Sequence, residues 1–293
     1  MILHDYISSD VYQRRHAILI GHPVSHSLSP LMHNTSADYY DLDLEYVTVD
    51  IDSHQLGTAA FLLNNKNLVG VNITLPHKRQ IMKIVDRLTP EAHSIGAVNT
   101  IYKESHALIG HNTDSYGFSK PLLDNDVDLD GHRVIIFGTG GATKAILHAL
   151  SNMGVAEVVM VSRNPDRNQH SDAYASGSAT ESLHVTVTDY NAWSAYANEA
   201  SLIVNATPLG MSPNIDNSPV ADSETDLLAD KICYDIVYNP MNTKFLRQAE
   251  SSGAETIHGI DMLIHQGSKS FKKWTGKTFP VDKIRYTLLE YFK

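Results

Sequence analysis

The sequence predicts an α/β fold in two domains, the second of Rossmann type, completed by C-terminal helices. Four apolar residues at 134–137 run without alternation into the glycine-rich turn Gly138-Thr-Gly-Gly-Ala142, and a segment of helical periodicity follows. Over residues 17–114, short apolar runs alternate with helical segments, which is typical of an α/β sheet. Two helical segments near the C-terminus do not continue this alternation, and we expect them to pack back on the first domain.

The first domain is predicted to begin with a buried strand at residues 17–20. A helix that starts at Pro30 and is capped by Ser29 follows this strand. Apolar residues at helical spacing predict another helix from Pro76 to Leu88. Further elements are expected as strands at 45–50, 68–74, 97–102 and 108–114, and a helix at 55–64. Because ligands bind at the carboxyl ends of strands in such sheets, polar residues there are the site candidates.

The boundary between the domains is predicted in the segment 115–130, which ends in an acidic loop. We therefore expect a first domain of residues 1–115, completed by 259–293, and a Rossmann-type domain of residues 116–258. The Ser-, Ala- and Gly-rich segment 169–182 is expected to be exposed. The other elements expected here are strands at 157–161, 183–187, 202–205 and 232–237, and helices at 261–274 and 281–291.

The composition restricts the class of partner. The net charge of −10, with lysines and arginines scattered along the chain, argues against nucleic acid or an anionic membrane and favours a small molecule. The only cysteine, Cys233, lies in an apolar run and is predicted to be in the core, which suits a reducing compartment. No apolar run has the length of a membrane span and no signal pattern begins the chain, so we expect a cytoplasmic protein. The histidines form no metal-binding motif, and no metal site is predicted.

The glycine-rich turn is a candidate site for a pyrophosphate. Glycines let the backbone turn tightly and approach the anion, whose charge then lies at the positive end of the following helix. Thr143 occupies the position of the third glycine of the full dinucleotide motif, so a structural glycine turn is the alternative. The candidate residues are Gly138, Thr139, Gly140, Gly141 and Ala142.

The segment after the strand 157–161 indicates the cofactor. An NAD site usually has an acid at this point to bind the ribose 2′-hydroxyl, whereas this strand ends in Ser162-Arg163-Asn164. Arg163 and Arg167 can offer paired donors to a 2′-phosphate, which favours NADP. Asp166 lies between the two arginines, so NAD remains possible, and a solvated helix start is the structural alternative.

Polar residues in the first domain suggest a proton-transfer site. Asn72 and Thr74 leave one strand on the same face, and Lys78 follows them; Asn99 and Asp114 are predicted to end two further strands. A lysine ammonium can donate a proton, and an aspartate within reach can hold it in place. Taken singly, each residue also has a structural interpretation as a turn, a helix start or a cap.

Several segments together point to a family. They are Gly21-His-Pro-Val-Ser-His-Ser-Leu-Ser-Pro30, Val71-Asn-Ile-Thr-Leu-Pro-His-Lys78, Gly96-Ala-Val-Asn-Thr100, Asn112-Thr-Asp114, Gly138-Thr-Gly-Gly-Ala142, Asn205-Ala-Thr207 and Gly259-Ile-Asp-Met-Leu-Ile-His-Gln266. In this order, over residues 17–280, the sequence resembles the shikimate dehydrogenase family.

The resemblance implies a reversible NADP-dependent interconversion of shikimate and 3-dehydroshikimate, in the chorismate pathway of aromatic amino-acid biosynthesis, by a monomer or homodimer. It implies that Lys78 and Asp114 form the catalytic pair. The implied carboxylate ligands are Ser27, Ser29 and Tyr238, and the implied ligands of ring hydroxyls are Thr74, Asn99, Asp114 and Gln266. Ile236 and Gly259 match positions that line the nicotinamide end. The first domain would thus bind substrate and the second NADP.

Two departures from the family pattern leave alternatives open. Ser115 stands where many members have glycine, and the region 237–277 is closer to the quinate/shikimate dehydrogenase branch, which accepts NAD. A quinate/shikimate dehydrogenase is therefore one alternative, and a binding or regulatory protein that does not turn its ligand over is another. The presence of both Lys78 and Asp114 argues against the binding protein. A methyltransferase is disfavoured because no acid closes the strand 157–161.

Overall fold

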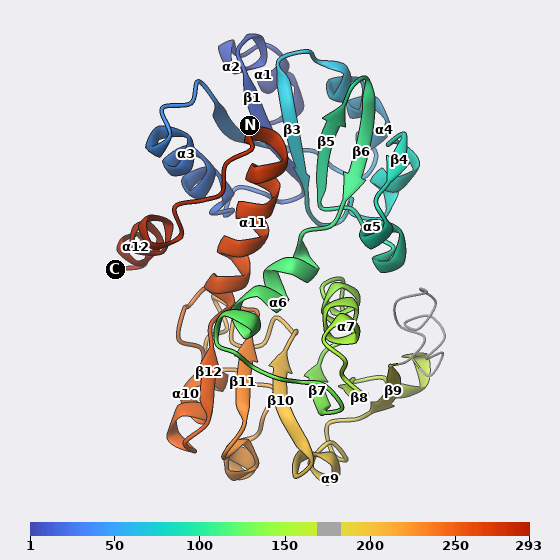
Figure 1. Ribbon diagram of the computed structural model, residues 1–293, viewed down its shortest axis with the longest axis vertical. Coiled ribbons are helices and arrows are strands. Elements are labelled where there is room, and N and C mark those ends of the chain that lie inside the picture. The colour runs from blue at the N-terminus through green and yellow to red at the C-terminus, as the bar shows by residue number, and fades with distance from the viewer. Residues whose placement is uncertain (169–182) are drawn as a thin grey trace. The chain divides into compact units, whose positions relative to one another are not determined.

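The computed structural model describes residues 1–168 and 183–293, which form two compact units (Figure 1). Unit 1 comprises Met1–Thr113, Gln266–Tyr291 and Lys293, and unit 2 comprises Asp114–His265 and Phe292. Each unit contains a sheet with helices, so the predicted α/β class is confirmed. The segment 169–182, expected to be exposed, lies outside the described residues.

The sheet of unit 1 has the strand order β2-β1-β3-β5-β6-β4. Its strands are β1 (His16–Gly21), β2 (Glu45–Asp50), β3 (Leu68–Ile73), β4 (Arg87–Leu88), β5 (Thr100–Glu104) and β6 (Ala107–His111). β1 pairs in parallel with β2 and β3, whereas β5 is antiparallel to β3 and β6. The carboxyl ends of β1, β3 and β6 therefore lie at the same edge as the start of β5. The prediction that Asn99 ends a strand is wrong, because Asn99 precedes β5, but the residue lies at this same edge.

The helices of unit 1 differ from the prediction in two places. Ser29 is the first residue of α3 (Ser29–Tyr39) and not its cap, and the N-cap residue Leu28 makes no side-chain cap hydrogen bond. The helix expected from Pro76 to Leu88 is only the 3₁₀ turn η2 (Gln80–Lys83), followed by β4. After η2 the chain does not continue as a helix but forms β4, which pairs with β6. The Asp86 carboxylate, just before β4, accepts a hydrogen bond from the Leu108 amide at 2.7 Å. The other helical elements are α1 (Leu3–Ile7), α2 (Asp10–Gln13), α4 (Leu56–Ala59), η1 (Ala60–Asn64), α5 (Pro90–Ile95) and α12 (Val281–Tyr291). Helix α11 (Gly259–Thr275) belongs to unit 1 from Gln266 onward.

The C-terminal part of α11 packs on the sheet of unit 1. The indole of Trp274 donates a hydrogen bond to the Ile101 carbonyl at 3.0 Å. The ring lies against Gly70 so closely that a Cβ there would lie 2.1 Å from its Nε1. The expectation that the C-terminal helices return to the first domain is confirmed.

Unit 2 is a parallel sheet with the strand order β12-β11-β10-β7-β8-β9. Its strands are β7 (Arg133–Phe137), β8 (Glu157–Val161), β9 (His184–Thr188), β10 (Ala200–Asn205), β11 (Ile232–Asp235) and β12 (Glu255–Ile257). Its helical elements include α6 (Asp114–Asp124), α7 (Thr143–Asn152), η3 (Pro165–Asn168), α9 (Ser194–Ala197), η4 (Asp222–Leu228) and α10 (Lys244–Ser251). Apolar clusters cover both faces of this sheet, and Cys233 is buried in one of them. From β7 the chain adds β8 and β9 on one side of the sheet, and then β10, β11 and β12 on the other side. The order of the strands therefore switches between β7 and β10, and ligands bind at such switch points in Rossmann folds.

Candidate active site

Two loops at the carboxyl ends of β1 and β3 hold four of the candidate residues. The loop after β1 carries Ser27 and leads to Ser29, and the loop after β3 carries Thr74 and Lys78. Backbone hydrogen bonds tie the loops together, from the Thr74 amide to the Ile20 carbonyl at 2.9 Å and from the His22 amide to the Leu75 carbonyl at 2.9 Å. A side chain at Gly21 would prevent this approach, since its Cβ would lie 2.3 Å from Thr74 Cγ2. Ser27 and Lys78 therefore lie on adjoining loops, and Ser29 begins the helix that follows the first loop.

A histidine–aspartate pair holds the serine-bearing loop to β2. His22 Nδ1 lies 2.6 Å from Asp50 Oδ1, and the Val24 amide donates to Asp50 Oδ2 at 3.3 Å. The hydrogen bond to His22 lowers the pKa of Asp50, and the same bond raises the pKa of His22. Neither residue was selected from its sequence context, because the pairing of β1 with β2 brings them together.

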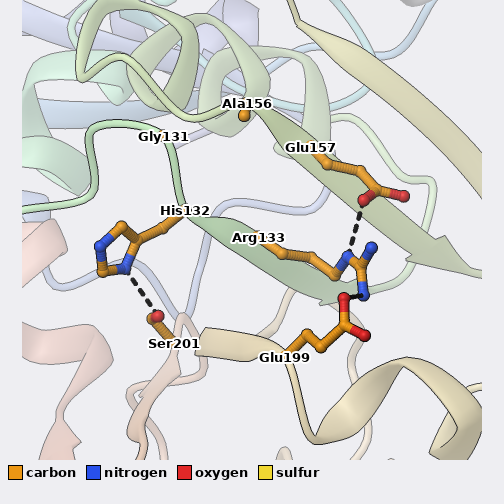
Figure 2. A pocket seen from close by; sticks show the side chains of 7 residues that line it. All are labelled: Gly131, His132, Arg133, Ala156, Glu157, Glu199 and Ser201. Atoms are coloured by element: carbon orange, nitrogen blue, oxygen red, sulfur yellow. Dashed lines mark hydrogen bonds and ion pairs between the residues drawn. The ribbon is translucent and has the colours of Figure 1, made fainter.

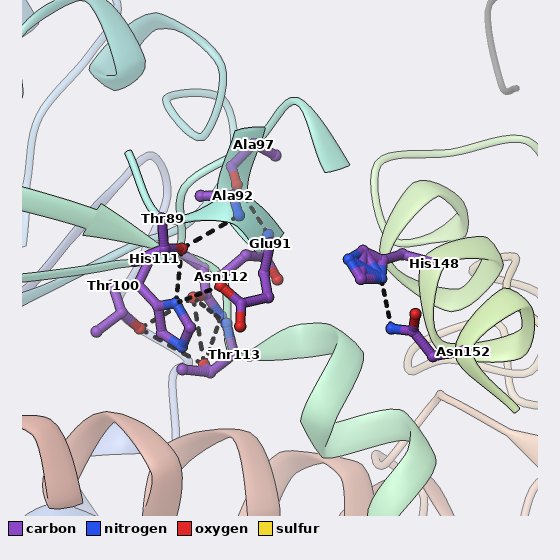
Figure 3. A network of polar contacts seen from close by, with 11 residues as sticks. Thr89, Glu91, Ala92, Ala97, Thr100, His111, Asn112, Thr113, His148 and Asn152 are labelled. Atoms are coloured by element: carbon purple, nitrogen blue, oxygen red, sulfur yellow. Dashed lines mark hydrogen bonds and ion pairs between the residues drawn. The ribbon is translucent and has the colours of Figure 1, made fainter. Parts of the chain in front are cut away.

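Asn99 is oriented by its neighbours. Its side-chain oxygen accepts hydrogen bonds from the Thr113 amide at 2.8 Å and the Thr100 hydroxyl at 2.9 Å, and its amide nitrogen donates to Thr113 Oγ1 at 2.9 Å. Figure 3 shows Thr100 and Thr113 in this network, beside Asn112, whose side chain donates to the Ala97 carbonyl at 3.0 Å. The backbone also joins Asn99 to Lys78, because the amide of Val98 donates to the Lys78 carbonyl at 2.8 Å.

The network around Asn99 extends to α11. Ser270 Oγ lies 2.7 Å from Thr100 Oγ1 and accepts a hydrogen bond from Asn72 Nδ2 at 3.0 Å. Thr113 Oγ1 donates to Gln266 Oε1 at 3.5 Å. The candidate ligand Gln266 is thus attached to the same network as Asn99, although the sequence separates them widely. Ser270 was not predicted, and Asn72 was noted in the sequence only for its position on the strand.

The structure therefore brings six predicted residues into one unit, at the carboxyl edge of its sheet and on the adjoining α11: Ser27, Ser29, Thr74, Lys78, Asn99 and Gln266. The remaining candidates for substrate, Asp114 and Tyr238, belong to unit 2. The prediction that Asp114 ends a strand is wrong, because Asp114 is the first residue of α6. Tyr238 follows β11, and burial raises the pKa of its hydroxyl. The Lys78–Asp114 pair stays a prediction.

The glycine-rich turn of unit 2 has the conformation of an anion-binding loop. Gly138 has φ 109°, which a residue with a side chain rarely adopts, and its Cβ would lie 3.0 Å from the Ala206 carbonyl. Gly140 has open space where a side chain would be. Helix α7 begins without a side-chain cap, so its first turn can receive an anion. Thr143 is buried, and its hydroxyl donates to the Gly138 carbonyl at 3.1 Å, so it closes the turn.

The segment after β8 presents polar groups to solvent. The Ser162 hydroxyl accepts a hydrogen bond from the Asn164 amide at 3.2 Å, and Arg163 and Asn164 are exposed. Arg167 lies in η3, and its side chain is outside the described part of the chain. Ile236 and Gly259 lie together, since a Cβ at Gly259 would come 2.6 Å from the Ile236 carbonyl oxygen. The roles predicted for these residues in cofactor binding stay predictions.

A pocket of 380 Å³ lies at the opposite end of the unit 2 sheet (Figure 2). Arg133, the first residue of β7, pairs there with Glu157 at 2.7 Å and with Glu199 at 2.5 Å, and His132 Nδ1 lies 2.7 Å from Ser201 Oγ. This is the amino edge of the sheet, whereas ligands of Rossmann folds bind at the carboxyl edge. We therefore do not assign the pocket to the site.

Two classes of feature do not occur among residues 1–168 and 183–293. No three histidine, cysteine or acidic side chains gather there in a way that could hold a metal ion. No helix of this part is long and apolar enough to cross a membrane.

Comparisons with known proteins match both units. Residues 19–101 match the family described as shikimate dehydrogenase substrate binding domain, residues 259–289 the shikimate 5'-dehydrogenase C-terminal domain, and residues 134–217 the saccharopine dehydrogenase NADP binding domain. The shikimate dehydrogenase (NADP(+)) of Synechocystis sp. is 35% identical over 277 residues, covering 94% of this chain and 95% of that protein.

Solved structures give the same result. Shikimate 5-dehydrogenase from Listeria monocytogenes, in complex with shikimate and NAD, has a TM-score of 0.86 at 31% identity and covers 94% of this chain and 96% of its own. Quinate dehydrogenase from Corynebacterium glutamicum, in complex with NAD, has a TM-score of 0.83 at 29% identity, covering 94% and 99%. The predicted resemblance is thereby confirmed, and the chain belongs to the shikimate dehydrogenase family.

Proposed function

We propose that the protein is an NADP-dependent shikimate dehydrogenase that interconverts shikimate and 3-dehydroshikimate in aromatic amino-acid biosynthesis. The observation that carries this proposal is the set of six family-matching residues in unit 1, placed by the tied loops and the network of Asn99. Two relatives support the proposal. The Synechocystis protein is named shikimate dehydrogenase (NADP(+)), and the Listeria protein was solved in complex with shikimate. In this proposal unit 1 binds the substrate and unit 2 binds the cofactor, and the protein works in the cytoplasm as a monomer or homodimer.

The substrate carboxylate would be bound by the hydroxyls of Ser27, Ser29 and Tyr238. A hydroxyl that donates to a carboxylate makes a charge-assisted hydrogen bond, and the N-terminal turn of α3 adds its positive dipole end. Thr74, Asn99 and Gln266, with Asp114, would bind the ring hydroxyls. The orientation of the Asn99 amide by Thr113 and Thr100 prepares it for a ligand without reorganisation on binding.

Lys78 would carry the proton transfer. In the reductive direction, negative charge develops on the carbonyl oxygen, and the Lys78 ammonium stabilises and protonates it. In the oxidative direction Lys78 accepts the proton of the reacting hydroxyl, and Asp114 holds the lysine in place. The bound nicotinamide supplies the hydride chemistry.

The cofactor residues fit NADP. The Gly138 turn and the uncapped start of α7 offer backbone N–H groups to the pyrophosphate, with Thr139, Gly140, Gly141 and Ala142. Ser162, Arg163, Asn164 and Arg167 would bind the 2′-phosphate, and Ile236 and Gly259 the nicotinamide end. A second candidate is a quinate/shikimate dehydrogenase that uses NAD or NADP, and the similarity to the Corynebacterium protein supports it.

A matrix of four assays tests the proposal, with shikimate or quinate as substrate and NADP⁺ or NAD⁺ as cofactor. We expect the largest kcat/KM with shikimate and NADP⁺. A larger value with quinate and NAD⁺ would assign the protein to the second candidate. Binding of shikimate without turnover in any combination would identify a non-catalytic binding protein.

A further inference from the structure

The buried carboxylate of Asp235 is the centre of a network in unit 2. Asp235 is the last residue of β11 and is 0% exposed. Its Oδ1 accepts hydrogen bonds from the Val237 amide at 2.9 Å and from Asn205 Nδ2 at 3.0 Å, and its Oδ2 accepts one from the Thr243 hydroxyl at 2.6 Å. Burial raises the pKa of Asp235 to about 6, against the opposing effect of these three donors. A buried acid is costly unless it is satisfied in this way, and an apolar side chain would fill a core at less cost.

One arm of the network fixes the loop after β10. Besides Asp235, Asn205 Nδ2 bonds to the Leu209 carbonyl at 3.1 Å. Asn205 Oδ1 accepts hydrogen bonds from the Thr207 amide at 3.0 Å and the Thr207 hydroxyl at 2.6 Å. The backbone of this loop contacts the glycine-rich turn, since a Cβ at Gly138 would lie 3.0 Å from the Ala206 carbonyl.

The other arm holds the segment 236–242 at both ends. The amide of Val237 bonds to Oδ1 at its start, and Thr243 bonds to Oδ2 just after its end. Thr243 is also the N-cap of α10, because its hydroxyl accepts a hydrogen bond from the Leu246 amide at 3.3 Å. One carboxylate thus ties the segment to the sheet and to a helix.

This segment carries Ile236 and Tyr238, to which the proposed function assigns the nicotinamide end and the substrate carboxylate. We propose that Asp235 is a positioning residue of the reaction, which acts through Val237 and Thr243 to hold Ile236 and Tyr238 in place. The inference rests on the proposed function. Asp235 touches neither ligand; it fixes the backbone that presents the two side chains.

Kinetics of four variants test the inference. Asp235→Ala removes the hydrogen bonds of the carboxylate to Val237 and Thr243, and Thr243→Val removes the second of them. We expect each variant to lower kcat and to raise the KM for shikimate by on the order of 10- to 100-fold. Asp235→Asn and Thr243→Ser keep hydrogen-bonding groups in place and should recover most of this loss. Affinity for 2′,5′-ADP should stay within about twofold in the two Thr243 variants. Thr243 bonds to the carboxylate beyond the end of the segment 236–242, whereas this fragment would bind at the glycine turn and Arg163. Asp222→Asn is the matched control. It removes the charge of an exposed carboxylate in η4 that pairs with Lys244 of α10, and it should leave kcat and KM unchanged.

Amide hydrogen exchange measures how firmly the segments bonded to Asp235 are held, independently of enzyme activity. Faster exchange confined to residues 205–211 and 236–243 in Asp235→Ala, or in Asp235→Asn if the alanine variant does not fold, supports the inference. Unchanged exchange there would overturn it, as would equal losses for shikimate and for 2′,5′-ADP in the Thr243 variants, which indicate general damage to the fold. Absence of turnover in the unsubstituted protein would overturn the proposed function instead.

Discussion

At the scale of the residue, Ser27 has a local structural role besides its proposed contact with the substrate. Its hydroxyl oxygen accepts a hydrogen bond from the Ser29 amide at 3.2 Å, which leaves its proton to donate to a carboxylate. We predict that Ser27→Ala raises the KM for shikimate by about 10- to 100-fold, since a hydrogen bond to a charged group contributes about 1.5–3 kcal/mol. The KM for NADP⁺ should change little. Ser25→Ala, an exposed serine in the same loop, is the control, and equal KM values for the two variants would leave Ser27 as a loop residue.

His33 is a buried residue of α3 with an unusual environment. It is 1% exposed and stacks on Tyr46 with ring centroids 4.2 Å apart. Within the described part of the chain, neither ring nitrogen has a hydrogen-bond partner. Burial lowers the pKa of His33 to about 3, so the folded protein keeps this imidazole neutral.

This residue makes the stability of unit 1 depend on pH. An unfolded histidine has a pKa of about 6.5, so the unfolded state binds a proton below that pH and the folded state does not until about pH 3. Stability is therefore lost as pH falls through this window, by about 2 kcal/mol at pH 5. We predict that His33→Phe, which keeps the stacked ring, removes this contribution, as measured by urea unfolding at pH 7 and pH 5. The exposed control His54→Gln should keep the full pH dependence, and parallel pH curves for the His33 variant and the unsubstituted protein would refute the prediction.

The site was only partly predictable at this scale. Motif spacing selected Ser27, Lys78 and Asn99 as candidates, because they lie in segments that match the family pattern. It did not select Ser270 or Asp235, whose roles depend on partners that the fold brings together. Ser270, for example, accepts its hydrogen bond from Asn72, a residue of a strand near the other end of the chain.

At the scale of the element, the turn after β8 should decide the choice of cofactor. Ser162 and Arg163 directly follow this strand, where an NAD site usually has an acid, and Arg163 is exposed. Burial raises the pKa of Tyr190, and the charge of Arg163 opposes this rise. We predict that Arg163→Ala weakens NADP⁺ binding by about 10-fold or more and NAD⁺ binding by much less, because only NADP⁺ offers a 2′-phosphate. Isothermal titration of both cofactors measures this. Arg285→Ala on α12 removes the same charge elsewhere, and equal losses for NAD⁺ and NADP⁺ in Arg163→Ala would remove the arginine from the phosphate site.

Four strands of unit 2 (β7, β8, β10 and β11) were predicted to within a few residues because they are largely buried and form continuous apolar runs. Strand β12 was not predicted, because it is short and partly exposed. The helix expected from Pro76 to Leu88 failed for a physical reason. Apolar residues at helical spacing also suit a 3₁₀ turn followed by an edge strand, and Ile81 is buried in the core in this arrangement as well. Sequence periodicity does not contain the pairing of β4 with β6 that decides between the two.

At the scale of the whole molecule, unit 1 is built from both ends of the chain. The residue that permits this is Gly70, over which Trp274 lies. We predict that Gly70→Ala destabilises unit 1 by at least about 1–3 kcal/mol, because the new methyl group would overlap the indole and no small rotation avoids it. Thermal unfolding followed by circular dichroism checks this. Gly57→Ala, in α4 with open space around it, should be neutral or stabilising by up to about 1 kcal/mol, and a similar result at Gly70 would contradict the packing described for α11.

The proposed function of the whole molecule depends on one reaction, the oxidation of shikimate by NADP⁺ with Lys78 as the proton-transfer group. The most direct test is the rate at which the nicotinamide absorbance band appears when shikimate and NADP⁺ are mixed with the protein and with its Lys78→Ala variant. We predict rapid reduction by the protein and a rate lower by about 10²- to 10⁴-fold in the variant, with shikimate affinity nearly unchanged, since positioned acid–base groups contribute in this range. A variant as fast as the unsubstituted protein, or a protein that binds both compounds and reduces no NADP⁺, would contradict the account.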